Sequence, residues 1–450
     1  MTKSGWILIV VASIWLPMFA GAKAPDVVHC GVDLDRAVLP AGGPQKAVIK
    51  VTLNASEAPS KIDRPPVNLS IVLDRSGSMS GSKIEKAKEA AIEALRRLDA
   101  RDMFSLVVYD HEVETICTAQ SARNAESIER KIRGIRSRGN TALFAGVSQA
   151  AAEIRKNLHD RYVHRIILLS DGLANVGPSS PADLSRLGTA LLKEHITVST
   201  VGVGNDYNED LMTQLAQCSD GNTYFVESSP DLPRIFAAEL GDVLSIVARD
   251  VILEIECAGG ARPLRIIGRD GRISNNRVEL KLNQLYGGQA KYALIEVEVP
   301  EGRDNELREI AVARCKYDNA LTRKRESSSG QVQARYSTDK NEVNASVNSE
   351  VQHEWFANAG ALAIDEAVEL WDSGDRREAV RTLREKSNEL KKNAGEYNLP
   401  EESQRVAEAL EEEADALEKE GLDSGRRKNY RQGSYQIKSQ QENDTVDLLR

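Results

Sequence analysis

A short apolar run at residues 68–73 constrains this chain most, because it ends directly in the polar loop Asp74–Ser78. A short apolar run of this kind is typical of a strand that is covered on both faces. Residues 83–98 then repeat apolar side chains at helical spacing, with Ser82 at the expected N-cap position. The loop should therefore lie at the carboxyl end of a parallel strand, where open α/β sheets bind their ligands.

This loop offers only oxygen ligands, namely the carboxylate of Asp74 and the hydroxyls of Ser76 and Ser78. Such a set suits a hard cation, and Mg²⁺ better than Zn²⁺. Three ligands in five residues do not enclose an ion, so other loops at the same sheet edge must contribute. The candidates are Thr141, in a glycine-containing loop that opens a helix, and Asp171, which directly follows a second apolar run.

Three motifs occur in a fixed order: D-x-S-G-S-M from Asp74, G-N-T ending at Thr141, and L-L-S-D-G ending at Gly172. In this order they resemble a von Willebrand factor type A domain, whose metal-ion-dependent adhesion site is built from those three loops. The resemblance covers roughly residues 67–247. The stretches at 171–177 and 201–208 are further similar to bacterial secreted proteins that are often labelled calcium-activated chloride channel homologues.

The resemblance implies that the three hydroxyls bind the metal directly and that the two carboxylates act mainly through bound water. The ion would be Mg²⁺, with Mn²⁺ or Ca²⁺ as alternatives, and an Asp or Glu of a protein partner would complete its coordination. Arg75 stands where small or apolar residues are commoner, and it would lower metal affinity if it pointed inward. Ligation could also shift the helix expected at residues 232–246, as in integrin-type domains.

Strands and helices alternate throughout residues 66–247, which predicts an α/β domain with a doubly wound, mostly parallel sheet. An edge strand is expected at residues 112–118. Asp110 and Asp206 are further loop acids, interpreted as turn or cap residues. The expected main strands are residues 68–73, 103–109, 165–169, 197–203 and 222–226.

Residues 248–345 change to short alternating strands separated by Gly and Asn clusters, which predicts a β-sandwich. Residues 25–60 contain one clear strand and a turn, but they are too few for a domain of their own. We therefore predict that they complete the sandwich and that the α/β domain is inserted between them. In that case residues 32–55 must pair with strands beyond residue 250.

Residues 351–420 follow a helical pattern that breaks at Ser373–Asp375 and again before Glu401. A helical bundle packed beside the sandwich is the simplest interpretation, although one helix pair is mildly similar to a tetratricopeptide unit. Residues 341–349 are polar and are expected to form a loop. The polar residues 421–450, which include several Arg and Lys, are expected to be disordered.

Residues 1–24 combine an early Lys, an apolar stretch and small residues at A-x-A spacing, which indicates a cleavable export signal. An uncleaved anchor is the alternative. We expect a secreted or periplasmic protein without a later membrane span. Export permits disulfides. Of the five cysteines, Cys30 could pair with Cys257 or Cys315, whereas Cys117 and Cys218 are interpreted as buried thiols.

The chain carries no complete catalytic motif. His111–Thr115 begins like H-E-x-x-H but lacks the second His, and neither a phosphate loop nor a G-x-S-x-G elbow occurs. A magnesium-dependent hydrolase stays open in principle, but no general base is evident. The net charge of −9 argues against nucleic acid as the main partner.

Two function classes remain. The first is a metal-dependent protein-binding or adhesion module without enzymatic activity. The second is a structural or assembly component of the cell envelope, in which the metal only stabilises the fold.

Overall fold

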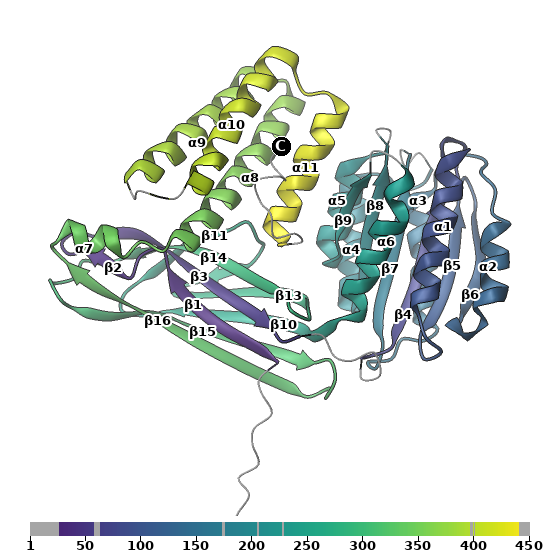
Figure 1. Ribbon diagram of the computed structural model, residues 1–450, viewed down its shortest axis with the longest axis horizontal. Helices are drawn as coiled ribbons and strands as arrows, with labels where there is room; N and C mark the ends of the chain where they lie inside the picture. Colours follow the sequence, from purple (N-terminus) through teal and green to yellow (C-terminus); the bar gives the residue numbers. More distant parts are fainter. Residues whose placement is uncertain are drawn as a thin grey trace, which may run out of the picture.

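The described chain consists of an α/β domain, a two-sheet β-sandwich and a helical bundle (Figure 1). This arrangement confirms the predicted fold class. The export signal expected at residues 1–24 and the last ten residues lie outside the described part. The computed structural model describes residues 27–57, 64–172, 176–204, 207–226, 229–396, 399 and 401–440.

The α/β domain is built on a six-stranded sheet in the order β6-β5-β4-β7-β8-β9. Every residue of β4, β7 and β8 is buried, because helices cover both faces of these central strands. All neighbours pair in parallel except the edge strand β6, which is antiparallel to β5. The strands are β4 (Val67–Asp74), β5 (Met103–Tyr109), β6 (Val113–Ser121), β7 (Val163–Ser170), β8 (Ile196–Val203) and β9 (Thr223–Val226).

The helices of this domain form two groups, and each group packs against one face of the sheet through its own apolar layer. Ile71 and Leu73 of β4 pack in the layer that contains α1, α2 and α6, whereas Val72 packs in the opposite layer with α3, α4 and α5. This alternation is what a strand's two-residue side-chain period requires. The helices are α1 (Ser82–Arg97), α2 (Ala125–Arg133), α3 (Leu143–Arg155), α4 (Pro181–Lys193), α5 (Glu209–Ser219) and α6 (Leu232–Leu244).

The N-cap predicted at Ser82 is wrong by one residue. Gly81 occupies the N-cap position with a φ of 77°, and without a side chain it makes no capping hydrogen bond. Glycine reaches this left-handed region without steric cost, so the chain can turn sharply from the Asp74–Ser78 loop into α1. Ser82 is consequently the first residue of the helix itself.

The β-sandwich combines strands from both sides of the α/β domain. β3 (Gln45–Ala55) pairs antiparallel with β14 (Ala290–Val299), from Gln45 opposite Val299 to Asn54 opposite Ala290. This is the pairing that the insertion hypothesis requires. One sheet has the order β1-β3-β14-β11 and the other β12-β13-β10-β15-β16-β2. The remaining strands are β1 (Val28–Leu34), β2 (Val38–Pro40), β10 (Ile246–Cys257), β11 (Arg262–Ile267), β12 (Arg272–Ser274), β13 (Arg277–Tyr286), β15 (Leu307–Asn319) and β16 (Arg325–Ser337).

A buried arginine of the α/β domain links this domain to the sandwich. Arg165 of β7 lies 3.2 Å from Glu239 of α6, and both side chains are fully buried. Arg165 also donates hydrogen bonds to Gln284 and Tyr286 of β13, at 3.0 and 2.8 Å. Because α6 continues into β10 through Ser245 alone, the helix is tied to the sandwich at its end and along its side.

Two helices, α7 against the sandwich strands β2 and β16 and α11 in the helical bundle, were not predicted from the sequence (Figure 1). The expected loop at residues 341–349 includes the short helix α7 (Lys340–Ala345), which Asp339 caps by accepting a hydrogen bond from the backbone N–H of Asn341. The expected break after Ser373 is confirmed, since Gly374 ends the helix with a φ of 96°. The other helices are α8 (Ser349–Ser373), α9 (Arg376–Glu396), α10 (Glu401–Glu420) and α11 (Ser424–Ser439).

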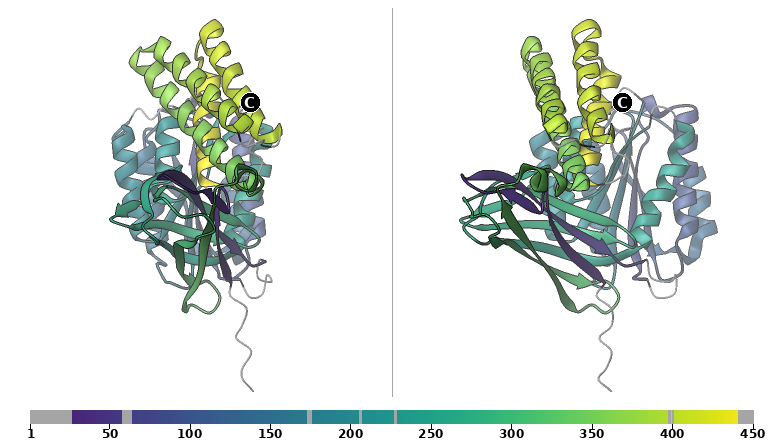
Figure 2. Two further views of the ribbon diagram at one scale, coloured as in Figure 1. Left: turned by 90° about the vertical axis from the view of Figure 1, so that its left-hand side faces the viewer. Right: turned by 60° about the vertical axis from the view of Figure 1, so that its left-hand side comes forward.

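Helix α11 corrects the prediction of disorder from residue 421. It packs between α8 on one side and α5 and β9 on the other (Figures 1 and 2). Lys428 is only 3% exposed and binds Glu209 at the start of α5, and Tyr435 donates a hydrogen bond to the carbonyl of Gly221. The polar composition of this segment suggested disorder. Composition alone does not reveal that a basic residue such as Lys428 has a carboxylate partner elsewhere in the fold.

All five cysteines are free thiols. Cys30, Cys257 and Cys315 lie in the sandwich core, where burial raises the pKa of Cys30 to about 11 and that of Cys315 to about 12. Cys117 is buried as expected, whereas Cys218 is only half-buried. Among the described residues, no helix combines the length and the apolar character needed to cross a membrane.

Candidate metal centre

The three loops predicted to form a metal site end up at one edge of the sheet. Asp74 is the last residue of β4, and Asp171 directly follows β7. These two strands are parallel neighbours, with Leu73 opposite Leu169, so both carboxylates emerge side by side. Thr141 comes from the loop before α3 and reaches the same edge.

Short distances connect the side chains from these loops. Ser76 Oγ lies 3.0 Å from Ser78 Oγ, and Ser78 Oγ donates a hydrogen bond of 2.7 Å to Asp171 Oδ1. The backbone N–H of Ser76 donates to Asp74 Oδ1 at 2.8 Å, which closes the loop over the carboxylate.

Gly172 borders the space that these groups share. A Cβ at Gly172 would lie 3.2 Å from Thr141 Oγ1, 3.5 Å from Ser78 Oγ and 3.8 Å from Asp74 Oδ2. The structure thus brings all the predicted site residues together.

Burial disfavours the negative charge of the carboxylates at this site. Asp74 is fully buried, and this loss of solvent raises the pKa of its carboxyl to about 6. Hydrogen bonds from Ser76 and Ser170 oppose this rise, and the charge of Asp171 adds to it. Two buried carboxylates this close repel each other, so the edge favours a cation. Three hydroxyls and two carboxylates, all of them oxygen donors, fit a hard divalent ion.

Sequence reasoning missed two residues of the site. Ser170 donates a hydrogen bond of 2.7 Å to Asp74 Oδ2 and so orients that carboxylate. Lys83 places its ammonium 2.5 Å from Asp171 Oδ2. The position of Ser170 at the end of the same apolar run was an available signal. The position of Lys83 at the start of the helix after the loop was a weaker signal, because the direction of its side chain depends on tertiary packing.

Arg75 turns away from the metal edge. Its guanidinium binds Asp110 at 2.8 Å and Glu114 at 2.7 Å. Asp110 also accepts a hydrogen bond from the backbone N–H of Glu112 at 2.8 Å, which confirms it as a turn residue. The predicted loss of metal affinity through an inward-pointing Arg75 therefore does not apply. Asp206 lies outside the described residues.

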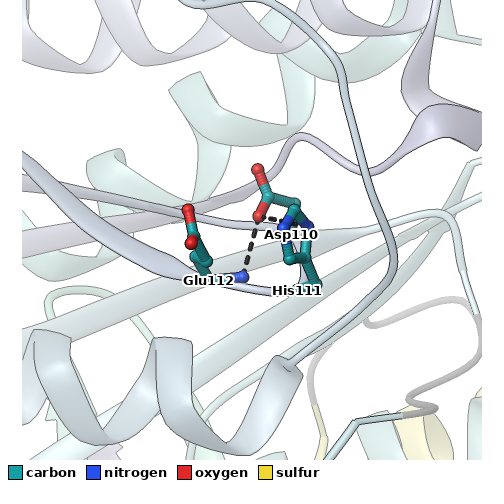
Figure 3. A group of neighbouring side chains, drawn as sticks. All are labelled: Asp110, His111 and Glu112. Carbon is teal, nitrogen blue, oxygen red and sulfur yellow. Dashed lines mark hydrogen bonds and ion pairs between the residues drawn. The ribbon is translucent and has the colours of Figure 1, made fainter.

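A second group of possible ligands lies beside this turn (Figure 3). Asp110, His111 and Glu112 place their ligand atoms within 4.8 Å of one another. Asp110 already binds Arg75 and Arg138, and Glu112 binds Arg138 at 3.1 Å. Burial would raise the pKa of Asp110, but the Glu112 N–H and the two guanidiniums hold it below its usual value. The group is therefore charge-compensated by its own neighbours.

Comparison with known proteins identifies the α/β domain. The family model described as von Willebrand factor type A domain matches residues 68–238, from β4 to α6, and so includes all three loops. The Synechocystis sp. protein sll0103 is 29% identical over 226 residues, which are 50% of this chain and 53% of that protein. Human inter-alpha-trypsin inhibitor heavy chain H4 is 27% identical over 206 residues, which are 44% of this chain and 22% of the heavy chain.

The chain therefore spans about half, or less, of the length of these relatives. The solved structure of a von Willebrand factor type A protein from Catenulispora acidiphila has a TM-score of 0.67 at 18% identity. It covers 90% of this chain and 96% of that one. At this identity the likeness supports the fold alone, but the 90% coverage means that it includes the sandwich and the bundle as well as the α/β domain. These relatives do not show the narrower resemblance to chloride channel homologues.

Proposed function

Because residues 68–238 form a von Willebrand factor type A domain, we propose that this protein is a secreted or periplasmic module that uses a divalent cation to bind a protein partner. The observation that carries the proposal is the convergence of oxygen-bearing side chains from three loops at one sheet edge. Domains of this family are generally interaction modules without enzymatic activity, and we assign no catalytic residue.

Each residue at the edge has a distinct role in this proposal. The hydroxyls of Ser76, Ser78 and Thr141 would hold the cation, and the carboxylates of Asp74 and Asp171 would act mainly through bound water. Mg²⁺ fits the donors best, with Mn²⁺ or Ca²⁺ as alternatives. When bound, the ion supplies a Lewis-acidic position for one more oxygen. Neutral hydroxyls leave much of its charge uncompensated, so an Asp or Glu of the partner is the matching ligand.

Binding of the metal alone is the first test. Isothermal titration with MgCl₂ should show one site in the wild type and none in the Asp74→Ala variant, with circular dichroism reporting the fold. Asp270→Ala is the matched control, because Asp270 is an exposed acid between β11 and β12 of the sandwich. Folded wild-type protein that takes up no Mg²⁺, Mn²⁺ or Ca²⁺ contradicts the proposal.

Dependence of partner binding on the metal is the second test. Immobilised wild-type protein is incubated with an envelope extract in Mg²⁺ and in EDTA, and Asp74→Ala protein serves as control. We expect the same bound proteins to be lost in EDTA and with Asp74→Ala, while the fold is retained. Binding that is unchanged in both conditions favours a structural or assembly role.

One observation favours that second candidate, a structural or assembly component in which the bundle makes the contacts. A hollow of about 560 Å³ lies between the end of α8, the start of α9 and the end of α10. The guanidinium of Arg376 lies over the ring of Trp371 there, 5.1 Å from its centre. Contacts made through this basic hollow would be insensitive to EDTA and weakened by Arg376→Gln together with Arg377→Gln.

A further inference from the structure

Lys83 holds an unusual position for a lysine beside a proposed metal site. It is the second residue of α1, and its ammonium lies 2.5 Å from Asp171 Oδ2. The other oxygen of the same carboxylate accepts the hydrogen bond from Ser78. Asp171 is fully buried, whereas the Lys83 side chain is 28% exposed. The ammonium therefore enters the site from its solvent side.

The ammonium of Lys83 compensates a charge that nothing else nearby compensates. Asp74 and Asp171 are both fully buried. Arg75, the cation adjacent in sequence, is directed to Asp110 and Glu114 instead. Of the cationic side chains in the part of the chain that the structure describes, Lys83 is the one that forms an ion pair with either site carboxylate. One unit of negative charge remains after this pairing.

A divalent cation and the Lys83 ammonium cannot both occupy this position. Both are attracted to the same carboxylate, and at separations of a few ångströms in a poorly solvated site they repel each other strongly. The flexible four-carbon stem of lysine and its partial exposure allow the ammonium to move outward. Gly204 at the end of β8 flanks this route, since a Cβ there would lie 3.7 Å from Lys83 Nζ.

We infer that Lys83 is a built-in substitute for the divalent cation and its competitor. It neutralises Asp171 while the site holds no metal, and it leaves Asp171 when a divalent cation binds. Its released ammonium then lies at the mouth of the site, where it can pair with the carboxylate of an acidic partner. This inference rests on the proposed function, because it assumes that the same edge binds a divalent ion.

The test uses the full chain and MgCl₂ alone as the probe. Lys83→Met keeps the length of the side chain and removes its charge. We expect the variant to bind Mg²⁺ roughly tenfold more tightly or better in isothermal titration, because the competing charge is gone. In EDTA we expect a lower unfolding temperature than for wild type, since two buried carboxylates then lack a cation, and saturating Mg²⁺ should remove this difference.

Lys86→Met is the matched control. Lys86 lies on the same helix and forms an exposed ion pair with Glu89, so its removal should change neither measurement. If wild type and Lys83→Met bind Mg²⁺ with equal affinity, or are equally stable in EDTA, the inference about Lys83 is overturned and the proposed function stands. If neither protein binds a divalent ion, the proposed function is overturned. The inference that Lys83 competes with the ion is then overturned as well.

Discussion

Replacing Gly172 with Ala tests the geometry of the proposed metal centre directly. The added methyl group would lie 3.2 Å from Thr141 Oγ1 and 3.5 Å from Ser78 Oγ, so the Thr141 hydroxyl must shift by a few tenths of an ångström. Mg²⁺ demands nearly ideal octahedral distances, and a shift of this size displaces one ligand. We expect Mg²⁺ binding to weaken by about 10- to 100-fold, which is about 1.4–2.8 kcal/mol.

The fold should tolerate this substitution. Gly172 does not occupy the left-handed region of backbone space, so alanine is permitted there. We expect the free energy of unfolding in urea to change by less than about 1 kcal/mol. Ca²⁺ accepts longer and less regular ligand distances, so its binding should weaken less than that of Mg²⁺.

The assay is isothermal titration with each ion on purified protein, with chemical unfolding in EDTA as the measure of stability. Gly241→Ala is the control, because a Cβ at that position on α6 would meet no atom within 4 Å beyond its chain neighbours and the adjacent backbone of its own helix. Unchanged Mg²⁺ affinity in Gly172→Ala would show that Thr141, Ser78 and Asp74 do not surround the ion, and the reasoning would fail.

Three further predictions concern the rest of the fold. Arg165→Met should lower the free energy of unfolding by about 3–5 kcal/mol in urea, because Glu239 is left buried without its cation, and the double variant with Glu239→Met should lose less. Burial lowers the pKa of His164 from 6.5 to about 4, so the unfolded chain binds the proton more tightly than the folded chain. The free energy of unfolding should therefore fall by about 3 kcal/mol as the pH drops from 6.5 to 4, and His164→Gln should reduce this pH dependence. Arg427→Gln with Lys428→Gln should increase hydrogen exchange throughout α11, because both cations bind carboxylates at the start of α5.

The ligands of the proposed site were predictable because each follows a strand that the sequence marks clearly. Asp74 ends the mostly apolar strand β4, Asp171 directly follows the mostly apolar strand β7, and adjacent parallel strands must deliver such residues to one edge. The pairing of β3 with β14 was predictable for a related reason, since an alternating strand needs a sheet to cover its apolar face. In both cases a local pattern determined the tertiary position.

The contacts that complete the site were not predictable in this way. Lys83 looks like any lysine at the start of a solvated helix, and only the packing of α1 directs it to Asp171. Helix α11 is polar enough to suggest disorder, and it folds because Glu209 and Asp210 of α5 bind its basic residues. Single-sequence patterns report which face of an element is apolar, but they do not report charge pairs between distant elements.

The insertion also determines which face of the α/β domain can meet a partner. The chain enters at the amino end of β4 and leaves from α6 into β10, so the sandwich lies away from the carboxyl edge that carries the proposed metal site. Helix α11 reaches that edge from another direction, because Arg427 and Lys428 bind the first turn of α5, which follows the end of β8. If the proposed function holds, a partner whose acid reaches the metal would approach on the side where α11 binds the start of α5. Under the proposed function, the start of α11 and the metal edge would belong to one partner-facing side of the molecule, with the sandwich as its support.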